Sequence, residues 1–167
     1  MFLDESGCNT DMTRRYAYSL GGSRAIDSAP LSKPKNTTIL SSIQLDGTLR
    51  YTTFSGGTTV ERFKRYLETD LLPHLNENSV LIMDNMKLHH AKAVKNLLDS
   101  SGVRYIYLPP YSPDLNPIEK LWSKVKAFLR KFKARTLDAL PNAIQNAFHA
   151  VTVSDCSGWF RFCGYAL

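Results

Sequence analysis

Three acidic residues stand where apolar stretches of the chain end, and their positions point to metal-assisted chemistry. Asp4 follows the apolar start of the chain, and Asp84 closes the apolar run of residues 79–83. Glu119 comes two positions after Pro117, in the first turn of an expected helix. Carboxylates suit Mg²⁺ and Mn²⁺, and two such ions about 4 Å apart can activate the attacking oxygen and stabilise the leaving one in phosphoryl transfer. We therefore expect these three acids to be both metal ligands and catalytic residues, with Asp84 as the bridge between two ions.

A stiff segment rich in proline holds the third of these acids. Four prolines fall within residues 109–117, and each ring fixes φ and biases the preceding residue away from helix. Asn116 then offers a helix N-cap, and Pro117 suits the first helical position. The segment predicts an extended loop that ends in a helix, with Glu119 held rigidly in the first turn.

The pattern of apolar residues predicts helices and strands of both kinds in one sheet. The first part of the chain favours strands, and Asp46-Gly47 between two of them is a hairpin signal. The period changes near residue 58, where Thr58 and Glu61 match a capping box. The expected strands are 1–4, 15–20, 37–45, 49–54, 79–84 and 103–108, and the expected helices are 58–72, 91–101, 117–132 and 136–151.

This order suggests an α/β class of fold, a ribonuclease H-like mixed sheet with helices on both faces. The first strand of such a sheet is central, so Asp4 would lie near its middle and Asp84 beside it, at the end of a parallel strand. Glu119 would approach from the long helix, whose apolar face includes Trp122 as a core residue. The fold would therefore allow the three acids to converge.

Two polar residues that follow Asp84 are expected to support it without binding metal themselves. His89 lies near the start of the helix 91–101, and Asn85 directly follows Asp84, where it would orient the strand end. Glu5 should take no part in the same site, because successive side chains of a strand point to opposite faces.

The charge of the chain favours a polyanionic partner. The net charge is +6 and the pI is near 9.3, and the sixteen residues 120–135 hold seven basic residues and no acid. On charge alone a solvated helix face explains this run as well, but its place beside Glu119 favours nucleic acid. The residues expected to contact DNA are Tyr111 in the proline segment and, after it, Lys124, Lys126, Arg130, Lys131 and Lys133.

Length and composition fit one soluble domain spanning residues 1–167. No apolar run approaches the length of a membrane span, and the start lacks the features of a signal peptide. The three cysteines lack the spacing of a zinc site and fit reduced thiols, so we expect a cytoplasmic protein.

Three blocks of the sequence resemble the signature motifs of bacterial insertion-sequence transposases in the mariner-related DDE superfamily. They are Asp4-Glu5-Ser6-Gly7, then Met83-Asp84-Asn85 with His89, and finally the run 108–119 with Trp122 and Lys126. The 34 residues between Asp84 and Glu119 also match the mariner-type triad. The resemblance covers nearly the whole chain, and it implies that Asp4, Asp84 and Glu119 are catalytic.

The resemblance implies a DDE endonuclease that uses Mg²⁺ or Mn²⁺, with two ions. It further implies cut-and-paste DNA transposition with insertion at TA dinucleotides, transposon ends and target DNA as partners, homodimer assembly, and a place in the bacterial cytoplasm or nucleoid. Members of the family usually carry an N-terminal helix-turn-helix region that reads the inverted repeats. Because Asp4 stands near the start, we expect that region to be absent from this chain and separately encoded or lost.

Two other functions remain open on the sequence alone. A ribonuclease H-like nuclease specific for DNA structure would share the fold and the metals, although it would not explain the proline segment. A DNA-binding transposase remnant without catalytic activity would explain the missing N-terminal region, although the chain retains all three acids.

Overall fold

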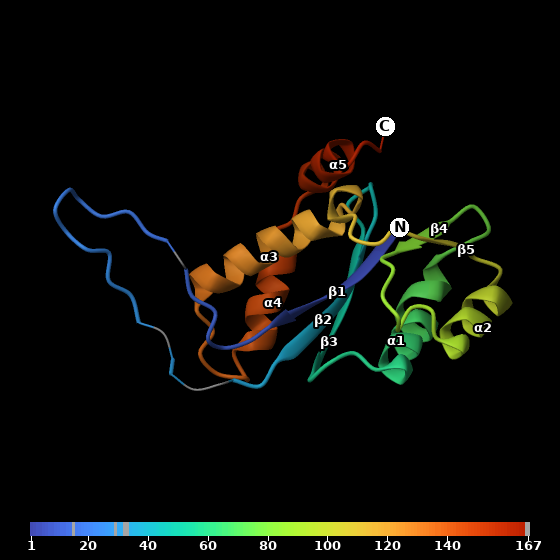
Figure 1. Ribbon diagram of the computed structural model, residues 1–167, viewed down its shortest axis with the longest axis horizontal. Coiled ribbons are helices and arrows are strands. Elements are labelled where there is room, and N and C mark those ends of the chain that lie inside the picture. The colour runs from blue at the N-terminus through green and yellow to red at the C-terminus, as the bar shows by residue number, and fades with distance from the viewer. Residues whose placement is uncertain (15, 29, 32–33, 166–167) are drawn as a thin grey trace.

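A five-stranded mixed sheet in the order β3-β2-β1-β4-β5 lies at the centre of the molecule (Figure 1). The computed structural model describes residues 1–14, 16–28, 30–31 and 34–165. The central strand β1 pairs antiparallel with β2 and parallel with β4, and β5 continues the parallel half. The strands are β1 (Phe2–Cys8), β2 (Thr37–Ile43), β3 (Leu49–Ser55), β4 (Val80–Met83) and β5 (Arg104–Tyr107).

The pairing of β1 with β4 determines where two of the predicted acids lie. Phe2 is opposite Ile82 and Leu3 is opposite Met83. Asp4 and Asp84 each follow directly, so the two aspartates occupy neighbouring positions on adjacent parallel strands. This is the placement that the ribonuclease H-like order predicts.

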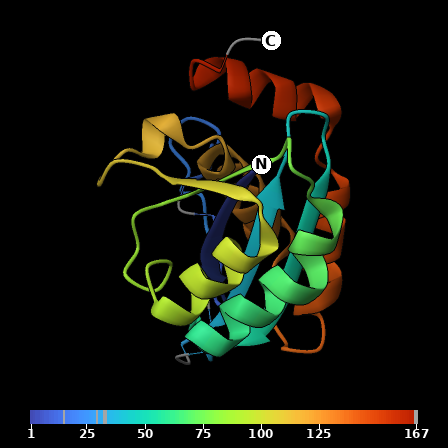
Figure 2. The same ribbon diagram turned by 90° about the vertical axis from the view of Figure 1, so that its right-hand side faces the viewer.

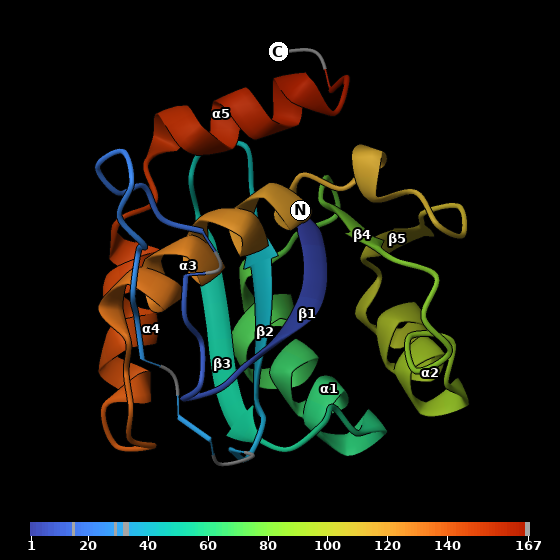
Figure 3. The same ribbon diagram turned by 60° about the vertical axis from the view of Figure 1, so that its left-hand side comes forward.

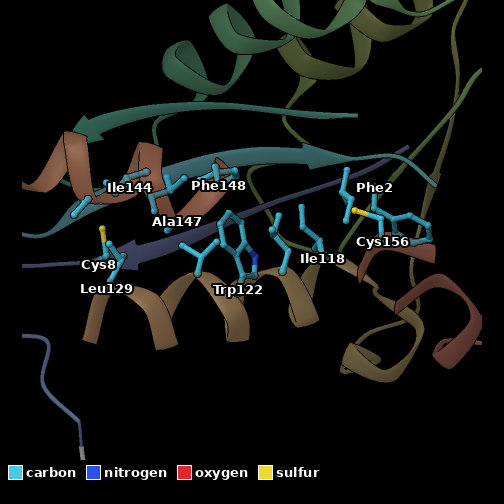
Figure 4. Close-up of a cluster of buried hydrophobic side chains, with 14 of the residues drawn as sticks. Phe2, Cys8, Ile118, Trp122, Leu129, Ile144, Ala147, Phe148 and Cys156 are labelled. Carbon is cyan, nitrogen blue, oxygen red and sulfur yellow. The ribbon is translucent and has the colours of Figure 1, made fainter. Parts of the chain in front are cut away.

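Helices cover both faces of the sheet (Figures 2 and 3). One core packs Phe2, Ile39 and Ile43 against α3, α4 and α5, and Figure 4 shows part of it. The other packs Leu3 and Leu40 against α1 and α2. Neighbouring residues of a strand thus enter opposite cores, as the pleat requires. The helices are α1 (Val60–Tyr66), α2 (Lys92–Ser101), α3 (Ile118–Phe132), α4 (Leu140–His149) and α5 (Val153–Phe162).

Several element boundaries differ from the sequence predictions. The helix after β3 is capped by Thr59, whose side chain accepts from the Arg62 amide, and continues beyond α1 as a π-helix and a short 3₁₀ turn that contains Pro73. The helix predicted from residue 136 begins only at Leu140, which places Pro141 in the first turn, where its missing N–H costs nothing. No helix in the described ranges is long and apolar enough to cross a membrane.

The strand predicted at 15–20 is wrong for residues 16–20, and Arg15 lies outside the described residues. Tyr16, Tyr18 and Leu20 are almost fully exposed. They belong to residues 16–28, a projecting segment that extends from the body between β1 and β2 (Figure 1). Both edges of β1 are already paired, by β2 and β4, so this segment adds no strand beside the strand that it follows.

The helix α5 was not predicted, although the sequence carries its start signal. Thr152 and Asp155 form a capping box, in which each side chain bonds the backbone N–H of the other residue. The helix lies across one end of the sheet (Figure 2), and Cys156 and Phe160 are buried on the face that packs against the core.

Candidate active site

The three predicted acids lie near enough for the charges of Asp84 and Glu119 to act on the carboxyl of Asp4. Asp4 and Asp84 come from adjacent parallel strands, and Glu119 lies in the first turn of α3. The pKa of the Asp4 carboxyl is raised to about 7, chiefly by burial and also by the negative charges of Asp84 and Glu119, against the hydrogen bonds that lower it. As they stand, the described His, Cys, Asp and Glu side chains form no group of three poised around a metal ion.

The indole of Trp122 binds Asp4 directly. Trp122 is 4% exposed, and its Nε1–H donates to Oδ2 of Asp4 over 2.9 Å. Its predicted place in the core is correct, but the hydrogen bond was missed. The signal was available, because Trp122 lies three residues after Glu119 and therefore shares that face of the helix.

Replacing Trp122 with Phe should remove this donor while it keeps most of the packing. We expect a loss of about 2 kcal/mol in the free energy of unfolding at pH 8, where Asp4 is ionised, and about 1 kcal/mol at pH 5, where it is neutral. Urea unfolding at both pH values measures this difference. Trp159→Phe is the control, since Trp159 is partly buried against the same core. Equal losses at the two pH values would contradict the role of the Trp122–Asp4 bond.

Asp84 is held by two donors on a single oxygen. Its Oδ1 accepts from His89 Nδ1 over 2.8 Å and from the Met86 backbone N–H over 3.1 Å. Burial raises the pKa of Asp84, but the hydrogen bond and charge of His89 outweigh it, so the pKa lies below its usual value. The pKa of His89 is correspondingly raised: burial lowers it, and Asp84 more than compensates.

The proline segment forms one wall of a cleft of about 480 Å³ beside these acids. Asp84, Asn85 and Glu119 also line this cleft. The side chain of Asn85 bonds His90 and not Asp84. Tyr111 is fully exposed at φ 58°, a left-handed conformation that is uncommon for a non-glycine residue and is often found at functional sites.

The predicted cap of α3 differs in detail. The helix begins at Ile118, and Pro117 occupies the N-cap position without a side-chain hydrogen bond. Asn116 is buried, its backbone carbonyl accepts from the Glu119 N–H over 3.1 Å, and its side-chain oxygen has no partner within the described residues. Glu119 is nevertheless fixed in the first turn, as predicted.

The six residues expected to contact DNA are not equivalent in the structure. Lys124 pairs with Asp155, and Lys133 pairs with Asp27 of the projecting segment. Lys126, Arg130 and Lys131 make no ion pair with any residue that the structure describes. Arg130 and Lys131 line a hollow of about 710 Å³ together with Tyr16 and Phe128, while Lys126 and Arg130 line a neighbouring one.

A mixed sheet of this order, with one carboxylate within the central strand β1 and another directly after the neighbouring β4, defines a ribonuclease H-like domain. Residues 1–141 match the family model described as DDE superfamily endonuclease, and the chain belongs to that family. The transposase of the element Tc1 from Caenorhabditis elegans is 31% identical over 97 residues, which are 56% of this chain and 36% of that protein. The Tcb2 transposase of Caenorhabditis briggsae is 32% identical over 75 residues, 45% of this chain and 28% of that protein.

Solved structures of Mos1 transposase share the fold. A paired-end complex with the left transposon end superposes with a TM-score of 0.79 at 19% identity, covering 96% of this chain and 50% of that chain. The catalytic domain of Mos1 mariner transposase gives a TM-score of 0.67 at 17% identity, covering 98% and 76%. The fold prediction is confirmed, and this chain spans about a third of the Tc1 transposase and half of the longer Mos1 chain.

Proposed function

We propose that this chain is the catalytic part of a DDE transposase, which cuts DNA at element ends and joins a 3′-hydroxyl to target DNA. The register of β1 with β4 carries the proposal, because Asp4 and Asp84 follow the paired residues Leu3 and Met83 and are therefore neighbours. The negative charge of Glu119 also raises the pKa of Asp4, which supports a place for Glu119 in the same site. The family match and the Tc1 and Tcb2 relatives support the transposase reading over a nuclease specific for DNA structure.

The three carboxylates fit a divalent metal site. Like charges that raise the pKa of a buried aspartate indicate a place where a cation would offset repulsion. Trp122 binds Oδ2 of Asp4. Both His89 and the Met86 N–H bind Oδ1 of Asp84, which leaves its Oδ2 without a hydrogen bond in the described ranges. We propose Asp4, Asp84 and Glu119 as the ligands of two Mg²⁺ or Mn²⁺ ions; Mos1 structures with each metal support this.

Within this site the chain's own side chains hold the aspartates in position and form a wall for the DNA. Divalent ions bound there would activate the attacking oxygen and stabilise the leaving oxygen. Trp122 and His89 fix the two aspartates, and the proline segment forms the wall against which a DNA end would lie. Tyr111 projects from that wall and is proposed to contact DNA.

The finer assignments are proposals as well. The proline segment supports an origin in a bacterial insertion-sequence element. The Mos1 paired-end and strand-transfer complexes support a homodimer with transposon ends and target DNA as its partners. All described elements belong to one sheet and its covering helices, which supports a single catalytic domain. The inverted repeats would then be read by a helix-turn-helix part outside these residues.

A titration of Mg²⁺ and Mn²⁺ with pre-cut transposon-end DNA tests this function. A transposase joins the 3′-hydroxyl ends to target DNA, a nuclease gives cleavage alone, and a remnant gives neither. Joined products that depend on the divalent ion are the expected result, and the other two outcomes would overturn the proposal.

The basic residues of α3 give a prediction on DNA binding. Replacing Lys126, Arg130 and Lys131 with Gln should flatten the slope of log K against log salt by two to three units, since each phosphate contact contributes about 0.9. Fluorescence anisotropy with a labelled duplex at several salt concentrations measures the slope. In the control triple variant, Lys92 and Lys95 of α2 and Arg104 of β5 are replaced with Gln. It loses the same amount of positive charge, but at a distance from α3 (Figure 3). Equal slopes in both triple variants would show that the DNA does not run along the basic residues of α3.

A further inference from the structure

A buried pair of polar side chains lies behind Asp84, and the site described so far does not use one of them. His89 is fully buried, and Glu5 of β1 is close to it with a side chain 12% exposed. His89 Nε2 and Glu5 Oε2 are both shielded from solvent, and neither has a hydrogen-bond partner within the described residues. They are 3.9 Å apart, which is within ion-pair distance and longer than a hydrogen bond.

The His89 ring is constrained on every side. Its Nδ1 lies 2.8 Å from Asp84 Oδ1, and because a carboxylate oxygen only accepts, Nδ1 carries a proton. The Glu5 carboxylate attracts Nε2 when that nitrogen is protonated as well, because a bare Nε2 presents only a lone pair to it. The ring stacks on Phe63 with centroids 4.5 Å apart, and Tyr107 donates its hydroxyl to the His89 carbonyl over 2.9 Å. The one remaining polar edge of the ring, Nε2, faces Glu5.

Glu5 therefore lies on the opposite face of β1 from Asp4 and still reaches the site through His89. The alternation of the strand turns Asp4 toward Trp122 of α3 and Glu5 toward Phe63 and His89. The sequence prediction that Glu5 does not join Asp4 in binding metal stays a prediction, but it gave Glu5 no role at all. The residue at this position faces a buried imidazole that in turn binds a proposed metal ligand.

We propose that Glu5 is a positioning residue for Asp84. Its carboxylate holds the His89 ring in the orientation that binds Oδ1 of Asp84, so that Oδ2 stays available to a divalent cation. This inference rests on the proposed function, in which Asp84 is a metal ligand. Removing a residue that orients a metal-binding side chain typically lowers metal affinity or activity by about 10–100-fold.

Glu5→Met tests the proposal, because Met has a similar length and no polar end. Removing a largely buried carboxylate whose Oε2 has no hydrogen-bond partner should leave the fold about as stable, as thermal unfolding would show. The affinity for Mn²⁺, measured by electron paramagnetic resonance with the metal alone, should fall about tenfold or more. In metal-free protein, the ¹⁵N-edited signal of the His89 Nδ1 proton should shift or broaden as the ring loosens. The control Glu77→Met makes the same change at an exposed position and should alter neither reading.

A Glu5→Met protein that keeps both its Mn²⁺ affinity and its His89 signal would overturn the proposal. If the variant does not fold, Thr58→Ala replaces it, because Thr58 hydrogen-bonds Glu5; the same two readings should then move in the same direction, and unchanged readings would again overturn it. Failure of the proposed function is distinguishable. An unaltered chain that binds no Mn²⁺ would refute the metal site, while the His89 signal, which is recorded without metal, would still decide whether Glu5 orients the ring.

Discussion

Replacing Asp84 with Asn should lower metal-dependent DNA cleavage and strand transfer by about a thousandfold or more. The substitution removes a charge proposed to bridge two cations, which is worth several kcal/mol at the transition state, and each 1.36 kcal/mol is tenfold in rate. The amide oxygen of Asn can still accept from the Met86 N–H and from His89. The fold should therefore survive, and the loss can be assigned to the charge.

The measurement compares single-turnover rates on pre-cut transposon-end DNA in Mg²⁺. Asp138→Asn serves as the control because Asp138 is exposed, between α3 and α4. Near-normal rates in Asp84→Asn would show that Asp84 does not bind the catalytic metal.

Replacing Asp4 with Asn should raise the stability of the metal-free protein at pH 8. Asp4 has a pKa of about 7 in the folded chain against 3.8 for an ordinary aspartate, so the folded state binds the extra proton between these values. Stability must then fall as pH rises from about 4 to about 7, and the full penalty is present above that range. At 1.36 kcal/mol per pKa unit the penalty is at most about 4 kcal/mol. Asn has no charge to bury, and its oxygen can still accept from Trp122.

Urea unfolding in EDTA at pH 4 and pH 8 checks this prediction. The variant and the unaltered protein should be equally stable at pH 4 and should separate at pH 8 by several kcal/mol in favour of Asn. The pKa of Glu5 is also raised, chiefly by burial, so part of the pH dependence remains in the variant and only the difference reports Asp4. Parallel pH profiles would contradict the account of Asp4, and Asp138→Asn should give such parallel profiles.

The fold and the placement of the three acids in it could be predicted because their signals are local, while the role of these acids as metal ligands stays a prediction. The apolar run that ends in Asp84 marks the end of β4, whereas β1 continues past Asp4 to Cys8 and the strand predicted at 1–4 was too short. The proline segment fixes the start of α3 within a residue. The sheet order followed from the sequence of elements, and the register of β1 with β4 then placed Asp4 beside Asp84. None of these steps needed a contact between side chains.

The contacts that the sequence did not reveal join residues far apart in the chain. Lys133 is paired by Asp27 and Lys124 by Asp155, so two of the cations expected on DNA are already neutralised by partners that no helical spacing reveals. Arg135, at the end of the same basic run, instead donates to backbone carbonyls of Thr10, Met12 and Ser28 and secures the projecting segment. A charge pattern shows where cations stand in sequence, but only the fold shows which of them are paired.

The central claim is that Asp4, Asp84 and Glu119 together hold the metal ions that act on DNA. Anomalous diffraction from crystals grown with Mn²⁺ and a transposon-end duplex tests it most directly. The account predicts manganese peaks between the carboxylates of these three residues, with Asp84 between two peaks. Manganese bound only elsewhere in the molecule, with these three side chains left without metal, would contradict it.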